Sequence, residues 1–203
     1  MKKIITCIAL LLIVAGCGPA INHTVAPDYS QIGPKRVVVL PVVWEKKAAD
    51  EAETISLLFR KMSSERLGLL NYSAVPLEEV DRTGAGQTDW FVGKTVDEIA
   101  AVFKADSVLY IRVKDWDKDD LLSYKSLKIS ASFELASALG KTLWQADYST
   151  NERDIGLDSR PMELAVYNAF EPRIQRFVDA VFSTLPPGEV QAGQKKTYFE
   201  WLP

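Results

Sequence analysis

The most specific chemical pattern in the sequence surrounds the thiol of Cys17. The aliphatic Val14 and two small residues, Ala15 and Gly16, come directly before it. Small side chains at these positions fit the cleft of a processing protease, and cleavage after them makes the cysteine the first residue of the mature chain. We therefore expect cleavage after Gly16 and chemical modification of the Cys17 sulfur.

The segment before Cys17 has the composition of a secretory signal. Lys2 and Lys3 precede an apolar run over residues 4–14, which is too short to cross a bilayer as a stable helix. Its last residues and Cys17 resemble the bacterial lipobox. That resemblance implies a diacylglycerol thioether on Cys17 and an acyl chain on the new amine. An ordinary signal that is cleaved a few residues later is the alternative.

The lipid determines the location that the sequence predicts. Each buried methylene contributes about 0.8 kcal/mol, so one chain binds a membrane marginally and two or more form a stable anchor. Gly18, and not an aspartate, follows the cysteine. By resemblance to the sorting rule of Gram-negative lipoproteins, this favours the periplasmic face of the outer membrane. Outer-membrane lipid is thus the first expected partner.

Composition excludes several functional classes. The 203 residues are 47% hydrophobic and 25% charged, with a formal net charge of −3, so no basic field exists to attract nucleic acid. Cleavage after Gly16 would remove Lys2 and Lys3 and no acid, which changes the charge to −5. One histidine and two cysteines are too few for the common zinc frameworks. We expect no metal and no cofactor besides the lipid on Cys17.

Two short motifs only partly match known binding loops. Gly93-Lys94-Thr95 has the ending of a phosphate-binding loop, but the pattern needs a glycine where Thr88 stands. Residues 115–120 contain alternating aspartates like a calcium loop, but Asp120 replaces the glycine of the turn and Ser126 replaces the bidentate glutamate. We interpret the first motif as a capped loop and the second as an acidic turn between strands.

No catalytic residue is predicted. The sequence contains no Gly-x-Ser-x-Gly elbow, and its one histidine, His23, precedes the expected folded domain. A Ser–Lys enzyme or one with paired carboxylates stays open as an alternative. The sequence therefore favours a protein that binds a partner over one that catalyses a reaction.

Four segments follow from these patterns: a signal peptide over residues 1–16, a lipidated tether over 17–34, an α/β domain over 35–185 and a C-terminal tail over 186–203. The tether contains three prolines and no periodicity. Residues 18–34 could extend about 55 Å at about 3.3 Å per residue. This length would let the domain stand off the membrane.

Hydrophobic periodicity predicts the elements of the domain. We expect strands over 35–43, 72–76, 107–113, 127–138 and 142–148, and helices over 50–69, from 96 onward and over 160–182. Thr95 and Glu98 form a capping box for the second helix, whose Ile99, Val102 and Phe103 should face inward. Pro172 should kink the last helix without ending it. The inward residues of that helix should be Met162, Ala165, Val166, Ala169, Phe170, Ile174, Phe177, Val178, Val181 and Phe182.

The resulting order β-α-β-α-β-β-β-α predicts an α/β fold with a single mixed sheet in two or three layers. Helical crossovers should make the first strands parallel, and tight hairpins should make the last strands antiparallel.

Aromatic side chains mark two candidate partner surfaces. Trp90 and Phe91 lie in a glycine-rich loop over residues 82–93, and Tyr198, Phe199 and Trp201 lie in the C-terminal tail. Aromatic residues are frequent anchors of interfaces, but they also bury large areas within their own domain. Both interpretations remain open for these five residues.

Three blocks of sequence resemble one protein family: PKRVVVLPV at 34–42, FKADSVLYIRV at 103–113 and LGKTLWQADYS at 139–149. Behind a lipobox, they are similar to a family of Gram-negative lipoproteins typified by a meningococcal surface lipoprotein. The resemblance implies an α/β domain similar to the N-terminal domain of TolB and to CsgG-type curli-secretion lipoproteins. It implies no catalytic residue. Relatives tend to carry a second proline and an asparagine where Val42-Val43-Trp44-Glu45 stands here.

The sequence therefore predicts a non-enzymatic lipoprotein that serves as an accessory or assembly factor of an envelope secretion complex. Its partner would be an envelope protein, such as a CsgG-like protein. The alternative is a periplasmic hydrolase or ligand-binding domain that acts on envelope polymers.

Overall fold

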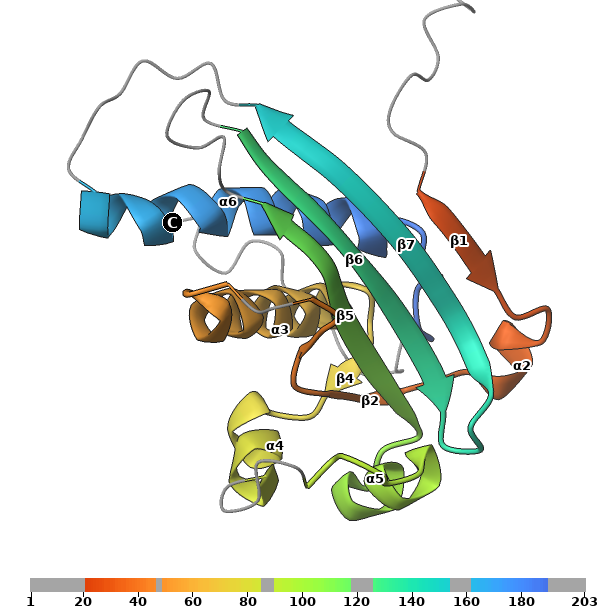
Figure 1. Ribbon diagram of the computed structural model, residues 1–203. Coiled ribbons are helices and arrows are strands. Elements are labelled where there is room, and N and C mark those ends of the chain that lie inside the picture. Colours follow the sequence, from red (N-terminus) through yellow and green to blue (C-terminus); the bar gives the residue numbers. More distant parts are fainter. Residues whose placement is uncertain (1–20, 47–48, 85–89, 118–125, 154–161, 190–203) are drawn as a thin grey trace, which may run out of the picture.

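The computed structural model describes residues 21–46, 49–84, 90–117, 126–153 and 162–189. Cys17 and the aromatic residues of the tail lie outside these ranges. A seven-stranded sheet forms the centre of the described part, and helices α3 and α6 cover one of its faces (Figure 1). The predicted α/β fold with one mixed sheet is confirmed.

The strands of the sheet lie in the order β1-β7-β6-β5-β2-β4, and β3 also pairs with β5. Strand β2 is parallel to β4 and β5, whereas β5, β6, β7 and β1 pair antiparallel. This division follows the connections, because helices link the first strands and a tight turn links β6 to β7. The strand bounds are β1 Asn22–Val25, β2 Arg36–Val39, β3 Val43–Trp44, β4 Ser73–Ala74, β5 Ser107–Asp117, β6 Ser126–Ser137 and β7 Thr142–Arg153.

Two of the predicted helices contribute most to the main core, α3 (Ala52–Leu69) and α6 (Met162–Phe182). The α6 helix runs through Pro172 as one element. Six of the residues expected to face inward on α6 are buried, and the side chains of Met162, Ala165, Val166 and Ala169 lie outside the description. The buried six are Phe170, Ile174, Phe177, Val178, Val181 and Phe182.

The sheet has a hydrophobic cluster on each face. Side chains alternate along β2, so Val37 and Val39 belong to the main core, whereas Val38 and Leu40 contact the second cluster. The second cluster is covered by the short helices α4 (Leu77–Gly84) and α5 (Val96–Phe103). The fold is therefore three-layered around β2 and β5.

Beyond β5 the sheet is two-layered. Alternate residues of β6 bury against α3 and α6, while the opposite face of the strand carries polar side chains such as Lys128, Ser130 and Glu134. One face of β6 and β7 is thus open. The buried set on β6 is Leu127, Ile129, Ala131, Phe133 and Leu135.

The expectation of an unstructured tether over residues 18–34 is wrong from residue 22 onward. Residues 22–25 form β1, which pairs with residues 144–147 of β7. Residues Tyr29–Ile32 form the short helix α2, and the Tyr29 side chain is buried. The edge of β7 supplies the strand pairing for residues 22–25, and the local sequence does not predict that pairing.

Two smaller expectations are also corrected, and one helix was not predicted. Val102 is 51% exposed, because α5 has only eight residues and buries the face formed by Ile99, Ala100 and Phe103. The helix α4 was not predicted, because only Val80 is buried in it. Residues 115–117 belong to β5 and not to a turn, and residues 118–125 lie outside the description. The capping box of Thr95 and Glu98 is confirmed.

Candidate partner surface

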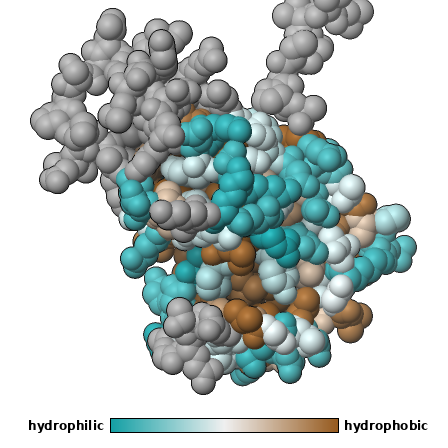
Figure 2. All heavy atoms as spheres, viewed as in Figure 1, coloured by the Kyte–Doolittle hydropathy of each residue, from teal (hydrophilic) through white to brown (hydrophobic). Residues whose placement is uncertain are grey.

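Three of the eight large hydrophobic side chains that are exposed in the described part lie on α5, on the segment before it and at the tip of the β6–β7 hairpin. Leu139 at the hairpin tip is 95% exposed, and Val92 in the segment before α5 is 74% exposed. Val102 on α5 adds a third apolar side chain. Figure 2 shows hydrophobic atoms at the end of the visible face where α5 and the hairpin tip lie. We call Val92, Val102 and Leu139, together with Trp90 and Phe91, the α5 surface.

The hairpin turn holds Leu139 in solvent. Backbone hydrogen bonds from Ser137 to Lys141 and from Gly140 to Ser137 close the turn. Gly140 has a φ of +79°, in the left-handed region that glycine adopts without steric cost. With the turn closed in this way, the Leu139 side chain projects from the hairpin tip into solvent.

Trp90 and Phe91 pack partly on their own domain. Their ring centroids lie 4.8 Å apart in an edge-to-face arrangement, and Trp90 makes a second such contact with Phe103 at 6.1 Å. The ammonium group of Lys94 lies 4.7 Å from the Trp90 ring centroid. Both aromatic side chains keep intermediate exposure, so part of each ring still faces solvent.

A shallow concavity of about 510 Å³ adjoins these residues. The start of α5 forms one wall and the hairpin forms the other; its lining residues are Lys94, Thr95, Val96, Asp97, Ala138, Leu139 and Gly140. Asp97 contributes the only carboxylate of this lining. A hydrogen bond with the Thr95 side chain holds the pKa of Asp97 below its ordinary value. One ionised carboxylate without a second acid offers no general acid–base pair.

The open face of the sheet carries ion pairs that cross the strands. Arg112 of β5 contacts Glu134 of β6 at 3.2 Å, and Lys114 contacts Asp147 of β7 across the sheet. Within the described residues, no group of three or more His, Cys, Asp or Glu side chains could hold a metal ion. Each of these two pairs joins side chains of opposite sign on different strands of this face.

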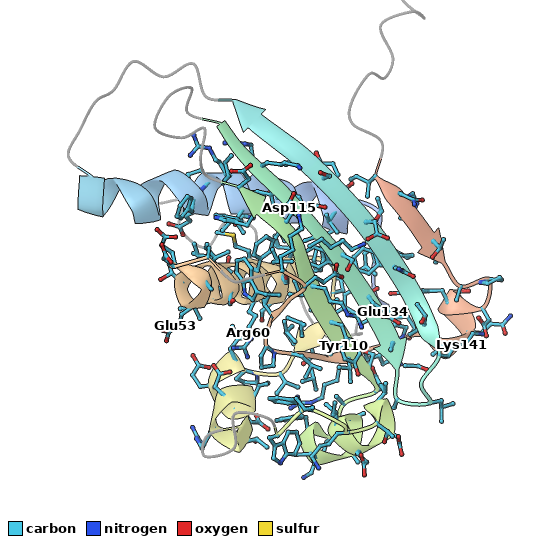
Figure 3. The ribbon with its side chains drawn as sticks, viewed as in Figure 1. Glu53, Arg60, Tyr110, Asp115, Glu134 and Lys141 are labelled. Atoms are coloured by element: carbon cyan, nitrogen blue, oxygen red, sulfur yellow. The ribbon has the colours of Figure 1, made fainter. Side chains whose placement is uncertain are left out.

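Asp115 joins two elements on this face. Its carboxylate accepts bonds from Lys128 and Lys46, each at 2.9 Å. These bonds favour the ionised form and lower the pKa of Asp115, and they raise the pKa of Lys128. In Figure 3, Asp115 lies far along the sheet from Lys141, which marks the hairpin end.

Some of the predicted site residues lie in the part of the chain that the structure describes, and the others lie outside it. Trp90 and Phe91 are described and lie together, whereas Gly16, Cys17, Tyr198, Phe199 and Trp201 lie outside the described residues. Sequence reasoning missed Leu139 and Val92 as surface residues. A leucine before the glycine of a tight hairpin was the available signal, because such turns normally carry polar residues.

Comparisons with solved structures show a likeness of fold. No protein-family model and no curated protein matches the chain. Lipoprotein GNA1162 from Neisseria meningitidis matches with a TM-score of 0.53 at 17% identity, over 72% of this chain and 99% of that chain. PelC from Paraburkholderia phytofirmans, solved as a dodecamer, matches with a TM-score of 0.48 at 15% identity, over 85% of this chain and 100% of that one.

A third solved structure, protein XCC0632 from Xanthomonas campestris, has a TM-score of 0.44 at 12% identity and covers 80% of this chain and 89% of its own. In the described part, no helix is both long and apolar enough to cross a membrane. At these identities the likeness concerns architecture alone. The chain has the α/β fold of the meningococcal lipoprotein GNA1162.

Proposed function

We propose that the protein is a lipoprotein anchored through Cys17 to the periplasmic face of the outer membrane. It acts there without enzymatic activity, as an accessory or assembly factor of a CsgG-like envelope secretion complex. The lipobox supports the anchor, and the resemblance of three sequence blocks to Gram-negative lipoproteins supports the cellular setting. The fold likeness to GNA1162 agrees with both.

The α5 surface is the observation that carries the binding role. It comprises three aliphatic side chains that are at least half exposed, on α5, on the segment before it and at the hairpin tip, and two partly exposed aromatic rings. Removing apolar surface from water favours association, although only part of that gain appears as affinity. Exposed apolar side chains together with aromatic ones are typical of a contact with another protein.

A photo-crosslinking amino acid at position 139, in the lipidated protein within its own envelope, tests this proposal. The same substitution at position 57 is the matched control, because Leu57 is an exposed leucine on α3, away from the α5 surface. We expect an adduct with a defined envelope protein from position 139 and none from position 57. Equal labelling from both positions would contradict the proposal, as would adducts with envelope polymers in place of a protein.

Replacing Cys17 by alanine separates the anchor from the binding surface. When it is exported behind an ordinary cleavable secretory signal in place of residues 1–16, the variant should fold and should leave the membrane fraction, because neither the lipid nor an apolar signal then holds it there. Retention of the variant in the membrane fraction would contradict the anchor.

A further inference from the structure

We propose that the domain meets the membrane by the projecting end of its sheet, where β5 and β7 end and β6 begins, and that the hairpin and the α5 surface point away from the bilayer. This inference rests on the proposed anchor at Cys17. The orientation follows from the length of chain before β1, the position of β1 on β7 and the direction in which β1 runs.

The chain between the anchor and the sheet is short. Cys17 precedes Asn22, the first residue of β1, by five positions. Five residues span at most about 18 Å when fully extended. The strand β1 therefore brings the domain much nearer to the lipid than a tether of residues 18–34 would.

The sheet projects beyond β1 by nearly the same distance. Asn22 lies opposite Asp147, and β7 continues for six more residues to Arg153. At about 3.3 Å per residue, this projection is about 20 Å long. The projecting end consists of β7 beyond Asp147 and of the paired segments of β5 and β6. Figure 1 shows these strands continuing past the start of β1.

The direction of β1 selects this end of the sheet. Because β1 is antiparallel to β7, the chain before Asn22 leaves the strand toward the end at which β7 finishes. The opposite end, at Leu139, lies eight residues from Asp147 along the chain. Reaching that end would require the chain to reverse at Ile21, whose side chain packs against the main core.

The segment after β1 fixes the domain relative to the strand. Ala26 donates a backbone hydrogen bond to Leu143, and Asp28 forms an ion pair with Lys141. The backbone N–H groups of Lys35 and Arg36 bond to the Asp106 carboxylate at 3.0–3.1 Å. These contacts hold β1 and the segment after it against the rest of the domain, so the short chain before β1 limits how far the whole domain can lie from the anchor.

Contact between the projecting end and the lipid headgroups follows. Because five residues at full extension reach no farther than the projecting strands do, an anchor at Cys17 brings the projecting end toward the lipid headgroups. Lys128 lies nine positions before Ser137, the last residue of β6, which corresponds to about 30 Å along the strand before the turn that carries Leu139. A partner that binds the α5 surface would therefore lie at the end of the domain that is farther from the membrane.

Single-cysteine variants of the lipidated protein test this orientation. Processing removes Cys7 and lipid occupies Cys17, so an introduced thiol is the only one available for labelling. Lys128→Cys marks the projecting end and Leu139→Cys marks the hairpin; both side chains are exposed. The fluorophore-labelled proteins are bound to vesicles of phosphatidylethanolamine and phosphatidylglycerol that contain a lipid with a nitroxide headgroup.

We expect strong loss of fluorescence from position 128 and little loss from position 139. Equal loss at both positions, or greater loss at 139, would overturn the orientation. A failure of the labelled, processed protein to sediment with the vesicles would instead contradict the proposed anchor. The two failures are thus distinguished by sedimentation of the same samples.

A longer tether provides the matched control. Ten Gly/Ser residues inserted between Gly18 and Pro19 add about 33 Å of reach. The protein should still sediment with the vesicles, but the fluorescence loss at position 128 should fall. An unchanged loss at position 128 would contradict tether length as the cause of the orientation.

Discussion

The hydroxyl group of Tyr29 is hydrogen-bonded to that of Tyr72 in the interior, although 43 residues separate them in the chain. Tyr72 also donates to the carbonyl oxygen of Pro186, so the Tyr29 hydroxyl must be the donor in the first bond. The pair joins three parts of the chain: helix α2 after β1, the segment after α3 and the segment after α6. The N-terminal segment is thereby part of the folded domain.

This order of donors predicts unequal effects for two matched variants. Tyr29→Phe removes one hydrogen bond and leaves the bond from Tyr72 to Pro186, so unfolding should become easier by about 1 kcal/mol. Tyr72→Phe leaves both the Tyr29 hydroxyl and the Pro186 carbonyl without their partner and should cost about 2–3 kcal/mol. Urea denaturation of both variants measures the difference. A larger effect for Tyr29→Phe would contradict the assigned direction of the bonds.

Alkaline pH should destabilise the same pair. Burial disfavours the phenolate and raises the pKa of both tyrosines above the ordinary value of 10.0. The unfolded chain then loses these protons at a lower pH than the folded protein does. The stability is complete below about pH 10 and falls as pH rises beyond it. The variant with both tyrosines changed to Phe should show a shallower fall, and an identical fall would contradict this cause.

Acid should weaken the contacts of Asp115. Its pKa is lowered by bonds from Lys128 and Lys46, so their contribution is present above the ordinary value of 3.8 and is lost as pH falls below it. Asp115→Asn should reduce the free energy of unfolding by about 0.5–1 kcal/mol at neutral pH, since both lysines are substantially exposed. The difference from the unchanged protein should disappear near pH 2. A difference that persists there would contradict the ionic origin.

The α5 surface should contribute to binding without contributing to stability. Leu139→Ser should change the free energy of unfolding by less than about 0.5 kcal/mol, because the side chain is almost fully exposed. By contrast, Phe133→Ala removes a fully buried ring between Phe59, Phe177 and Phe182 and should cost about 3–5 kcal/mol. Urea denaturation compares the two. A large loss for Leu139→Ser would mean that this leucine stabilises the fold.

Proline substitutions in β1 test whether residues 22–25 belong to the sheet. Along an antiparallel strand, neighbouring residues point their N–H groups to opposite sides, so one of His23 and Thr24 donates toward β7. One of the variants His23→Pro and Thr24→Pro should therefore cost about 1–3 kcal/mol, and the other should cost less. Two silent substitutions would restore the interpretation of this segment as a tether.

Sequence reasoning succeeded where the periodicity was long. The alternating residues of β6 and the helical pattern of α3 each bury a continuous face, so their local patterns match their environments. The predicted strands over 127–138 and 142–148 form the expected hairpin. The strands around β2 were less regular, because Pro41 separates β2 from β3, and each pairs with β5 at a different place.

The missed elements depend on distant partners. The sequence of β1 shows no apolar alternation, in keeping with the exposure of all four of its residues. The segment is a strand because it pairs with the edge of β7. Leu139 likewise gave no periodic signal, since its exposure comes from the geometry of the turn. Trp90 and Phe91 could be identified by residue type, but their packing against Phe103 and beneath Lys94 required the fold.

The mass of the N-terminal peptide shows whether Cys17 carries the proposed lipid. The protein is expressed in a Gram-negative host, isolated from membranes and cleaved, and its first peptide is analysed by mass spectrometry. We predict a peptide that begins at Cys17 and carries a diacylglycerol thioether and an N-linked acyl chain. A peptide that begins at an unmodified residue after Cys17, or one that retains Met1, would contradict the anchor and the orientation that depends on it.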